Sequence, residues 1–197
     1  MTRLALFPEV AELRHAKHEI ESQFLNRWSP RSFQEKPVPE TLLHRVLEAA
    51  RWAPSGNNLQ PWRFIVASTP DRLRAFHTFI NPSNLTWCAK APVLILVLSK
   101  TTTDKGTPAR THAFDAGAAW GYLALEAVHL GLVSHAMGGF DQEAARTTLQ
   151  IPEDYAMHAV VALGYRGPAD ALPPERQAAE RPSTRRPIEE SIVDFSV

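Results

Sequence analysis

The stretch APSGNNLQPWRFIVA, residues 53–67, places a loop directly before a strand. Its first half is rich in Pro, Ser, Gly and Asn, which end helices and form turns. Its second half, WRFIVA at 62–67, has the aromatic and β-branched residues that strands favour. Two adjacent asparagines, a glutamine and a tryptophan are more than a plain exposed connection needs. The stretch therefore predicts a helix end, a loop with its own polar side chains, and a strand.

Two helices are expected upstream of this loop. Apolar residues at helical spacing predict the first over roughly 9–26. The segment RWSPRSF, 27–33, interrupts that pattern with Pro30. The second helix begins near Pro39, because a proline in the first turn lacks only an N–H that the helix does not use.

Downstream of the loop, a short helix is expected at about 71–79, and VLILVLS at 93–99 has the composition of a strand buried on both faces. The stretch 101–110 looks like a loop, and 112–131 predicts a long helix that ends at Gly131. Small side chains let another helix approach closely, so this helix should be central or lie at a subunit interface. Its small residues are Ala116, Gly117, Ala118, Ala119 and Gly121.

The next stretch alternates between strand and helix. SHAMGGF at 134–140 reads as a strand that leads into a turn, Asp141 can cap a helix over 141–149, and HAVVALGY at 158–165 reads as another strand. Because helices and strands are interleaved, we predict an α+β domain with three layers around a central sheet.

The composition changes after about residue 166, where Pro, Arg and Glu dominate and apolar residues are few. Such a segment cannot easily bury itself, so it is either disordered or an arm that lies on another surface. The apolar character of IEESIVDFSV, 188–197, favours the arm. We therefore predict one domain over 1–170 with a C-terminal arm of the same domain over 171–197.

The bulk composition excludes several classes of function. Lys plus Arg and Asp plus Glu are both 21, so the net charge of zero argues against a general nucleic-acid or membrane-surface binder. The one cysteine, Cys88, allows no intrachain disulfide, and it is expected to be a packed residue rather than a reactive thiol. No signal peptide and no apolar run long enough for a membrane helix are found, so we expect a cytoplasmic protein.

Common catalytic motifs are missing from the sequence. It has no phosphate-binding GxxxxGK[ST] loop, no GxGxxG, no HExxH or CxxC that would support a metal site, and no GxSxG nucleophile motif. We therefore expect neither a metal nor a side-chain nucleophile.

Three other features could bind a ligand. Arg27, Ser29 and Arg31 alternate along an extended stretch, which turns them to one side in a manner that suits a phosphate, although a solvated turn would look the same. Arg181, Arg185 and Arg186 lie in the arm, where charged residues are usually solvated. Two glycines follow a strand and would let a flat ligand approach the backbone, or form a simple turn: Gly138 and Gly139.

In this order, these features resemble the FMN-dependent nitroreductase family, from residue 27 to residue 190. The segments that carry the resemblance are RWSPRSF (27–33), APSGNNLQPWRFIV (53–66), GLVSHAMGGFD (131–141), VVALGY (160–165) and RPSTRRPIEE (181–190). The resemblance implies a three-layer fold with a central mixed, mainly antiparallel sheet flanked by helices. It also implies a homodimer with FMN at the interface and a C-terminal arm that reaches the partner subunit.

The resemblance also assigns cofactor contacts to residues of this sequence. Arg27 and Ser29 would hold the FMN phosphate or ribityl chain, and Arg31 would lie near N1 and the C2 carbonyl of the ring. One or both of Arg185 and Arg186 would complete the phosphate site.

The loop and the strand end would contact the flavin ring. The cofactor-binding residues implied there are Pro54, Ser55, Gly56, Asn57, Asn58 and Gln60 in the loop, and Met137, Gly138 and Gly139 at the strand end, with Trp28 beside the phosphate residues. Asn58 offers both a donor and an acceptor to the polar edge of the ring, whereas Gln60 is expected mainly to brace the loop. Some family members carry Glu where this chain has Gly138, which removes one possible contact.

The implied activity is an FMN-dependent reduction of nitroaromatics, quinones or related acceptors by NADH or NADPH, through ping-pong hydride transfer at flavin N5. No catalytic side chain is expected, because the flavin carries the chemistry. Other chemistry on the same flavin fold stays open, namely flavin cleavage, dehalogenation or dehydrogenation. A non-catalytic flavin-binding protein and a structural interaction protein are further alternatives.

Overall fold

The strand Val93–Lys100 (β2) lies inside the sheet because nearly every one of its side chains is apolar and buried. The computed structural model describes residues 4–195, and its sheet has the strand order β1–β2–β4–β3. The other strands are β1 (Trp62–Ala67), β3 (Val133–Met137) and β4 (Tyr155–Gly164). All three pairings are antiparallel, with a register shift between Val97 and Leu98 where β2 meets β4.

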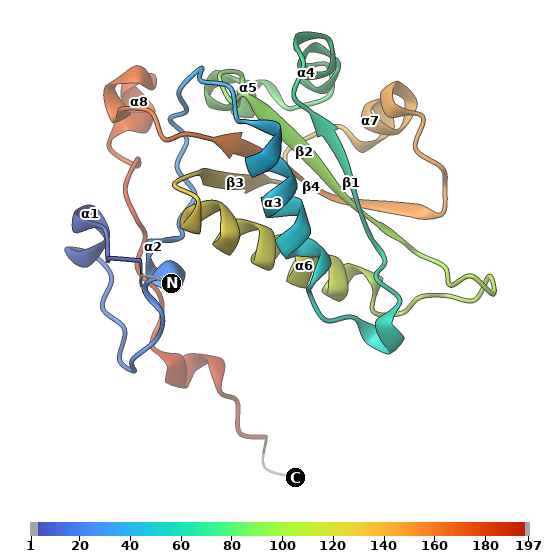
Figure 1. The fold of residues 1–197 in the computed structure, drawn as a ribbon, viewed down its shortest axis with the longest axis horizontal. Coiled ribbons are helices and arrows are strands. Elements are labelled where there is room, and N and C mark those ends of the chain that lie inside the picture. The colour runs from blue at the N-terminus through green and yellow to red at the C-terminus, as the bar shows by residue number, and fades with distance from the viewer. Residues whose placement is uncertain (1–3, 196–197) are drawn as a thin grey trace.

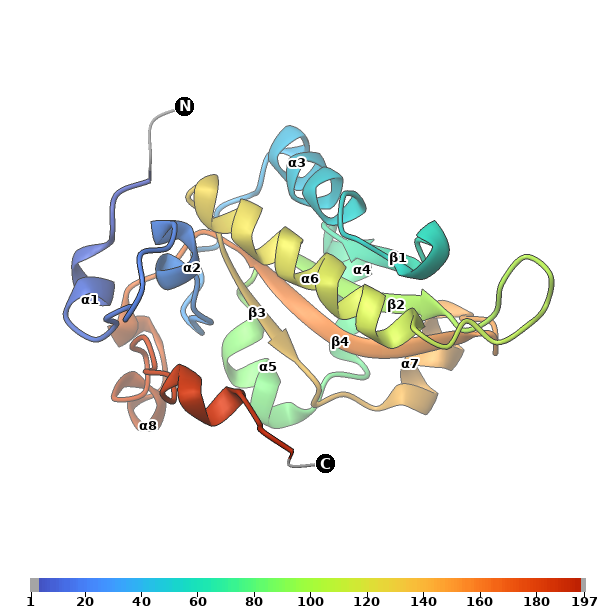
Figure 2. The ribbon, with the colours of Figure 1, turned by 90° about the horizontal axis from the view of Figure 1, so that it is seen from below.

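Alternate residues of β2 enter two separate cores. Leu94, Leu96 and Leu98 point to one face, and Val93, Ile95 and Val97 point to the other. The first face is covered by α4 (Pro70–His77), α5 (Pro82–Cys88) and α7 (Gln142–Leu149), and the second by α3 (Glu40–Arg51) and α6 (His112–His129). Figures 1 and 2 show the resulting three layers, which confirm the predicted α+β class.

Most of the predicted elements form within a few residues of their expected ends. Gly131 follows α6 with a φ of +72°, the left-handed conformation expected of a helix-ending glycine. The Asp141 side chain accepts a hydrogen bond from the N–H of Ala144 and so caps α7 as expected. Pro39 stands immediately before α3 as its N-cap residue. The helix α5 was not predicted, because its sequence PSNLTWC carries no long apolar period.

The prediction of one helix over 9–26 was wrong. The structure has two short helices there, α1 (Pro8–Ala11) and α2 (Ser22–Asn26), with irregular chain between them. Ile20 and Phe24, on the expected apolar face, are 46% and 50% exposed. A helix of this length depends on packing along one whole face, and part of that face is exposed to solvent here.

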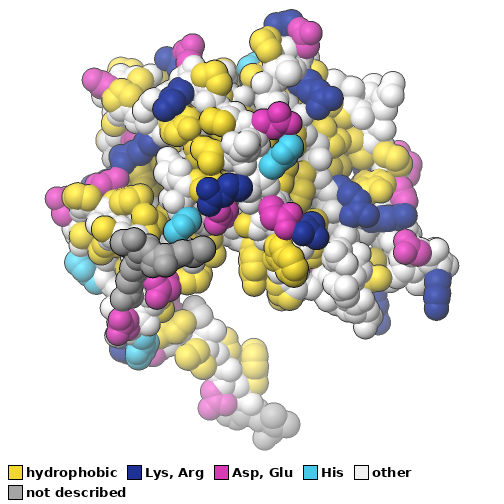
Figure 3. All heavy atoms as spheres, in the orientation of Figure 1, with side chains coloured by type: hydrophobic (Ala, Val, Ile, Leu, Met, Phe, Trp, Pro, Cys, Tyr) yellow, Lys and Arg dark blue, Asp and Glu magenta, His cyan; other side chains and the backbone are white. Residues whose placement is uncertain are grey.

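The C-terminal segment lies beside the N-terminal segment and then leaves the body of the chain (Figures 1 and 2). It contains a 3₁₀ turn at Ala169–Ala171, the helix α8 (Pro174–Gln177) and a 3₁₀ turn at Ile188–Ser191. Figure 3 shows the last part projecting from the body with hydrophobic atoms on its surface. Ile192, Val193 and Phe195 are 62–80% exposed there, so this end is not part of the core.

Two further expectations concern Cys88 and membrane helices. Cys88 is fully buried, and burial raises the pKa of its thiol to about 12, so it is a packed residue and not a reactive thiolate. Over residues 4–195, no helix has both the length and the apolar character needed to cross a membrane.

Candidate functional site

The segment RWSPR runs alongside β3 and presents two of the predicted residues together. One guanidinium nitrogen of Arg27 lies 3.5 Å from the Ser29 hydroxyl. The carbonyl of Pro30 accepts a hydrogen bond from His135 Nδ1 of β3 at 3.0 Å. The extended stretch is therefore fixed on the edge strand and is not a solvated turn.

A cluster of positive charge surrounds this segment. Burial lowers the pKa of Arg27, and the nearby guanidinium of Arg185 lowers it further. Burial, then Arg185 and then Arg27 lower the pKa of a third arginine, Arg14, to about 10. Within the described residues, no carboxylate lies within ion-pair distance of these three arginines. Three like charges that pair with no carboxylate among the described residues favour the approach of an anion.

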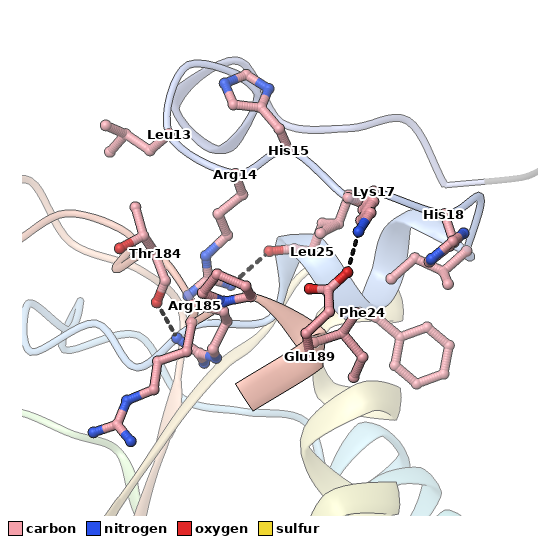
Figure 4. Close-up of a pocket in the computed structure, with 15 residues that line it drawn as sticks. Leu13, Arg14, His15, Lys17, His18, Phe24, Leu25, Thr184, Arg185 and Glu189 are labelled. Carbon is pink, nitrogen blue, oxygen red and sulfur yellow. Dashed lines mark hydrogen bonds and ion pairs between the residues drawn. The ribbon is translucent and has the colours of Figure 1, made fainter. Parts of the chain in front are cut away.

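One residue of the C-terminal arm, Arg185, lies close to this cluster. Arg185 reaches it and also donates hydrogen bonds to the Ser183 hydroxyl and the Thr184 carbonyl at 3.0 and 2.9 Å. Arg14, Arg185 and Arg186 line a pocket of about 610 Å³ between the N-terminal segment and the arm (Figure 4). An ion pair between Lys17 and Glu189 crosses one side of this pocket.

The end of β3 offers backbone groups rather than side chains. Gly138 is exposed, and a Cβ built there would meet nothing within 4 Å, so a flat ligand could lie against it. Gly139 is needed for a different reason, since its Cβ would lie 2.6 Å from the side-chain nitrogen of Asn84. The N–H groups of Gly138 and Gly139 donate to no group in the described part of the chain, and so they are available to a ligand.

The loop after α3 is tightly wound. Asn57, Asn58 and Gln60 all have φ near +50°, a left-handed conformation that Asn tolerates better than most residues and that gathers at functional sites. The loop is closed by hydrogen bonds from Gln60 to the Ser55 hydroxyl and to the Asn58 carbonyl. Gln60 therefore braces the loop.

The beginning of α6 supports this loop from beneath. The buried Asp115 carboxylate accepts hydrogen bonds from the Gly56 N–H at 3.2 Å and from the Thr111 hydroxyl at 2.9 Å. A Cβ at Gly56 would lie 2.6 Å from the Thr111 hydroxyl, so any larger residue would force this hydroxyl or the loop to move. Pro54 is exposed at the start of the loop.

One chain does not bring the loop and the arginine cluster together. The loop lies at the start of α6, whereas α2 and the RWSPR segment lie near its other end (Figures 1 and 2). The 18 residues of α6 span about 27 Å. The predicted residues therefore lie in two separate groups, which are called half-sites below: Arg27, Ser29, Arg31, Gly138, Gly139 and Arg185 in the first, and Pro54 to Gln60 in the second.

Two predicted contacts are packing residues in the structure. Trp28 is buried under the guanidinium of Arg166, which lies 4.9 Å from the ring centre. Met137 is buried in the core on the α5 side of the sheet. Neither side chain is exposed to a ligand in this chain.

Two buried charged residues beside the first half-site, Arg14 and Glu180, were not predicted from the sequence. Arg14 stands among apolar residues of the expected helix, and Glu180 stands in a polar segment that reads as solvated. They are only 7% and 6% exposed. A charged residue inside an apolar period could have marked Arg14, but no local pattern marks Glu180.

We predict that His135, beside this half-site, makes the stability of the folded protein depend on pH. Burial lowers its pKa to about 4, with a smaller contribution from Arg31, so the folded protein holds the neutral imidazole. Because the unfolded chain binds the proton better, the free energy of unfolding should fall as the pH falls from about 6.5 to 4, by up to about 3 kcal/mol. Urea unfolding of wild type and His135→Asn, which keeps a donor for the Pro30 carbonyl, measures this difference. Parallel pH curves for the two proteins would contradict it.

Comparison with known proteins adds the family. The family model described as Nitroreductase matches residues 25–86 and 75–165. A Thermus thermophilus protein named NADH dehydrogenase is 34% identical over 188 residues, covering 77% of this chain and 91% of the relative.

Solved structures agree with this match. One described as an oxidoreductase containing FMN superposes with a TM-score of 0.88 at 36% identity and covers 93% of this chain and 95% of its own. A nitroreductase family protein from Clostridium difficile 630 has a TM-score of 0.69 at 23% identity, covers 98% of this chain and 100% of its own, and shares the fold.

Proposed function

The chain belongs to the nitroreductase family, and we propose that it is an FMN-dependent oxidoreductase that uses NADH or NADPH to reduce small acceptors. The similar structure described as containing FMN supports the cofactor. The name of the Thermus relative supports a nicotinamide as the electron donor. FMN, when bound, supplies the hydride chemistry, and the chain supplies its binding and its electrostatic environment.

The observation that carries this proposal is the arginine cluster, which pairs with no carboxylate in residues 4–195. One terminal nitrogen of the buried Arg14 has no hydrogen-bond partner among the described residues, and Arg27 and Arg185 add two more positive charges. Like charges that lie this close repel one another, and the burial of Arg14 adds a desolvation cost, so a bound anion would stabilise the cluster. A phosphate monoester fits, with Arg27, Ser29 and Arg185 as its ligands.

A second copy of the chain would complete the site. The loop of residues 54–60 carries the other half, and it lies at the far end of α6. A two-fold dimer would place the loop of one protomer against the arginine cluster of its partner and so form two equivalent sites.

The outer face of α6 is open to such a partner. Nothing lies within 4 Å of a Cβ built at Gly117 or Gly121, and Phe114 on the same side of the helix is 80% exposed. The residues 114, 117 and 121 follow the i, i+3, i+7 spacing of one helix face. This stripe and the apolar end of the arm would be buried in the homodimer.

The acceptors proposed are nitroaromatics, quinones or free flavins, reduced in a ping-pong cycle through the flavin N5 atom. The half-site around the flavin ring consists of backbone and amide groups, so the chain orients the ring and stabilises charge rather than supplying a nucleophile. A large lid, which other chemistries on this fold use, has no counterpart between β2 and α6, where a short hairpin closed by the Thr102–Pro108 bridge fills residues 101–110.

Anaerobic reduction tests the proposal. Purified protein should carry FMN, lose its yellow colour with NADH or NADPH, and regain it with one of the proposed acceptors. Protein that binds FMN but resists reduction by both nicotinamides would favour a flavin-binding protein without turnover. Protein that binds no FMN would contradict the proposal.

A further inference from the structure

Beyond the bond from the Arg27 N–H to the Gln23 carbonyl that ends α2, the RWSPR segment has no helix or strand bond among the described residues. Side chains from distant parts of the chain bind its backbone instead. Arg14 donates to the carbonyls of Leu25 and Arg27, both at 2.7 Å, and His135 binds the carbonyl of Pro30. Each of these side chains binds a backbone carbonyl, and none of them binds a backbone N–H group of the segment.

The carboxylate of Glu180 binds the backbone N–H groups at the end of this segment. One oxygen of its carboxylate accepts hydrogen bonds from the backbone N–H groups of Arg31 and Ser32, at 2.8 and 2.9 Å, and its other oxygen accepts from Arg31 N–H at 2.9 Å. Among the residues that the structure describes, no cation forms an ion pair with Glu180. A buried carboxylate is stable here because both oxygens accept from these amides.

The neighbouring bonds hold the rest of this turn. The hydroxyl of Ser32 donates to the carbonyl of Pro168 at 2.6 Å, and the N–H of Gly167 donates to the carbonyl of Ser32 at 2.9 Å. The chain on both sides of Arg31 is therefore fixed, by Glu180 and Ser32 on one side and by Pro30 and its partner His135 on the other. The half-buried Arg31 side chain starts from a backbone that cannot shift freely.

We propose that Glu180 is a positioning residue, which sets the backbone of Arg31 and thereby the place where its guanidinium meets the flavin ring. The inference rests on the proposed function, because it assumes that Arg31 faces the ring. A buried charge on the arm thus acts on the cofactor through Arg31 rather than by touching it. If Glu180 only attached the arm to the body, replacing it would leave the reduction potential of the flavin unchanged.

Amide exchange tests the contact itself without any flavin. In the apoprotein, Glu180→Gln places an NH₂ group opposite the N–H of Arg31, where the second oxygen now accepts. Hydrogen exchange at the amides of Arg31 and Ser32 should become about 10- to 100-fold faster, with exchange in β2 unchanged. Unchanged exchange at these two amides would overturn the proposal. Glu175→Gln is the matched control, since Glu175 is exposed on α8 and accepts no side-chain hydrogen bond from the described residues.

A double-mutant cycle on the holoprotein tests the consequence. Glu180→Gln should lower the reduction potential of bound FMN, and the same change in an Arg31→Met background should lower it no further. Glu180→Asp keeps the charge and should restore part of the potential, and it replaces Gln in the cycle if Glu180→Gln does not fold. An unchanged potential in Glu180→Gln, or equal shifts in the two backgrounds, would overturn the proposal. A wild type that binds no FMN would defeat the proposed function instead, and the exchange result would stand by itself.

Discussion

Removing residues 181–197 is expected to release FMN and to loosen the dimer. The deletion removes Arg185 from the anion cluster and takes away the Ser183 carbonyl that accepts from Arg14 Nε at 2.8 Å. It also removes the exposed apolar end of the arm. Loss of one charged ligand alone should weaken phosphate binding by roughly 10- to 100-fold. Flavin content after gel filtration and the mass from sedimentation measure the two effects.

A shorter deletion separates these effects. Removing 192–197 keeps Arg185 and Arg186 but removes the apolar residues of the tip, so it should weaken the dimer more than it weakens phosphate binding. Arg185→Met should do the reverse, and Arg181→Met, on the same arm but not among the charges that act on Arg14 and Arg27, should do neither. A full deletion that keeps both its colour and its dimeric mass would show that the arm is only a tail.

Arg31→Met is expected to lower the reduction potential of bound FMN and to slow its reduction by NAD(P)H. The physical reason is charge: reduced flavin is anionic at N1 and oxidised flavin is neutral, so a guanidinium beside N1 favours the reduced form. Such a contact is worth roughly 2–4 kcal/mol in a site without water, or about 40–90 mV for a two-electron couple. Redox titration against a reference dye measures the shift.

The matched control is Arg31→Lys, which keeps the charge and should keep most of the potential. Oxidised FMN should still bind to Arg31→Met, because the phosphate is held by other residues. An unchanged potential would make Arg31 a surface arginine. A variant that loses FMN but shows a normal potential once reconstituted would reassign Arg31 to the phosphate.

The sequence predicted most of the fold because its signals are local. The apolar run of β2, the proline before α3 and the glycine after α6 each act within a few residues of themselves. The failed helix over 9–26 shows the limit of such signals. Its apolar period is real, but whether one face finds a surface to pack on is decided by the rest of the chain.

The candidate site residues could be named one by one from the sequence, but their arrangement in space could not be predicted. The residues of the loop and of the RWSPR segment were named, yet nothing in their spacing shows that α6 separates them. Arg14 and Glu180 were missed because their roles depend on contacts with residues 11 to 169 positions away. Long-range contacts of this kind leave no periodic trace in a sequence.

The most direct test of a cofactor site shared between two protomers is to mix two defective ones. The first variant combines Arg27→Met with Arg185→Met and loses the anion half-site. The second carries Gly56→Val, which displaces the loop because even a Cβ there would lie 2.6 Å from the Thr111 hydroxyl. Neither homodimer should retain FMN. Heterodimers isolated through two different affinity tags should bind about one FMN each, because one of their two sites is built from the intact halves. Heterodimers that bind no FMN, although wild type prepared in the same way does, would contradict the shared site.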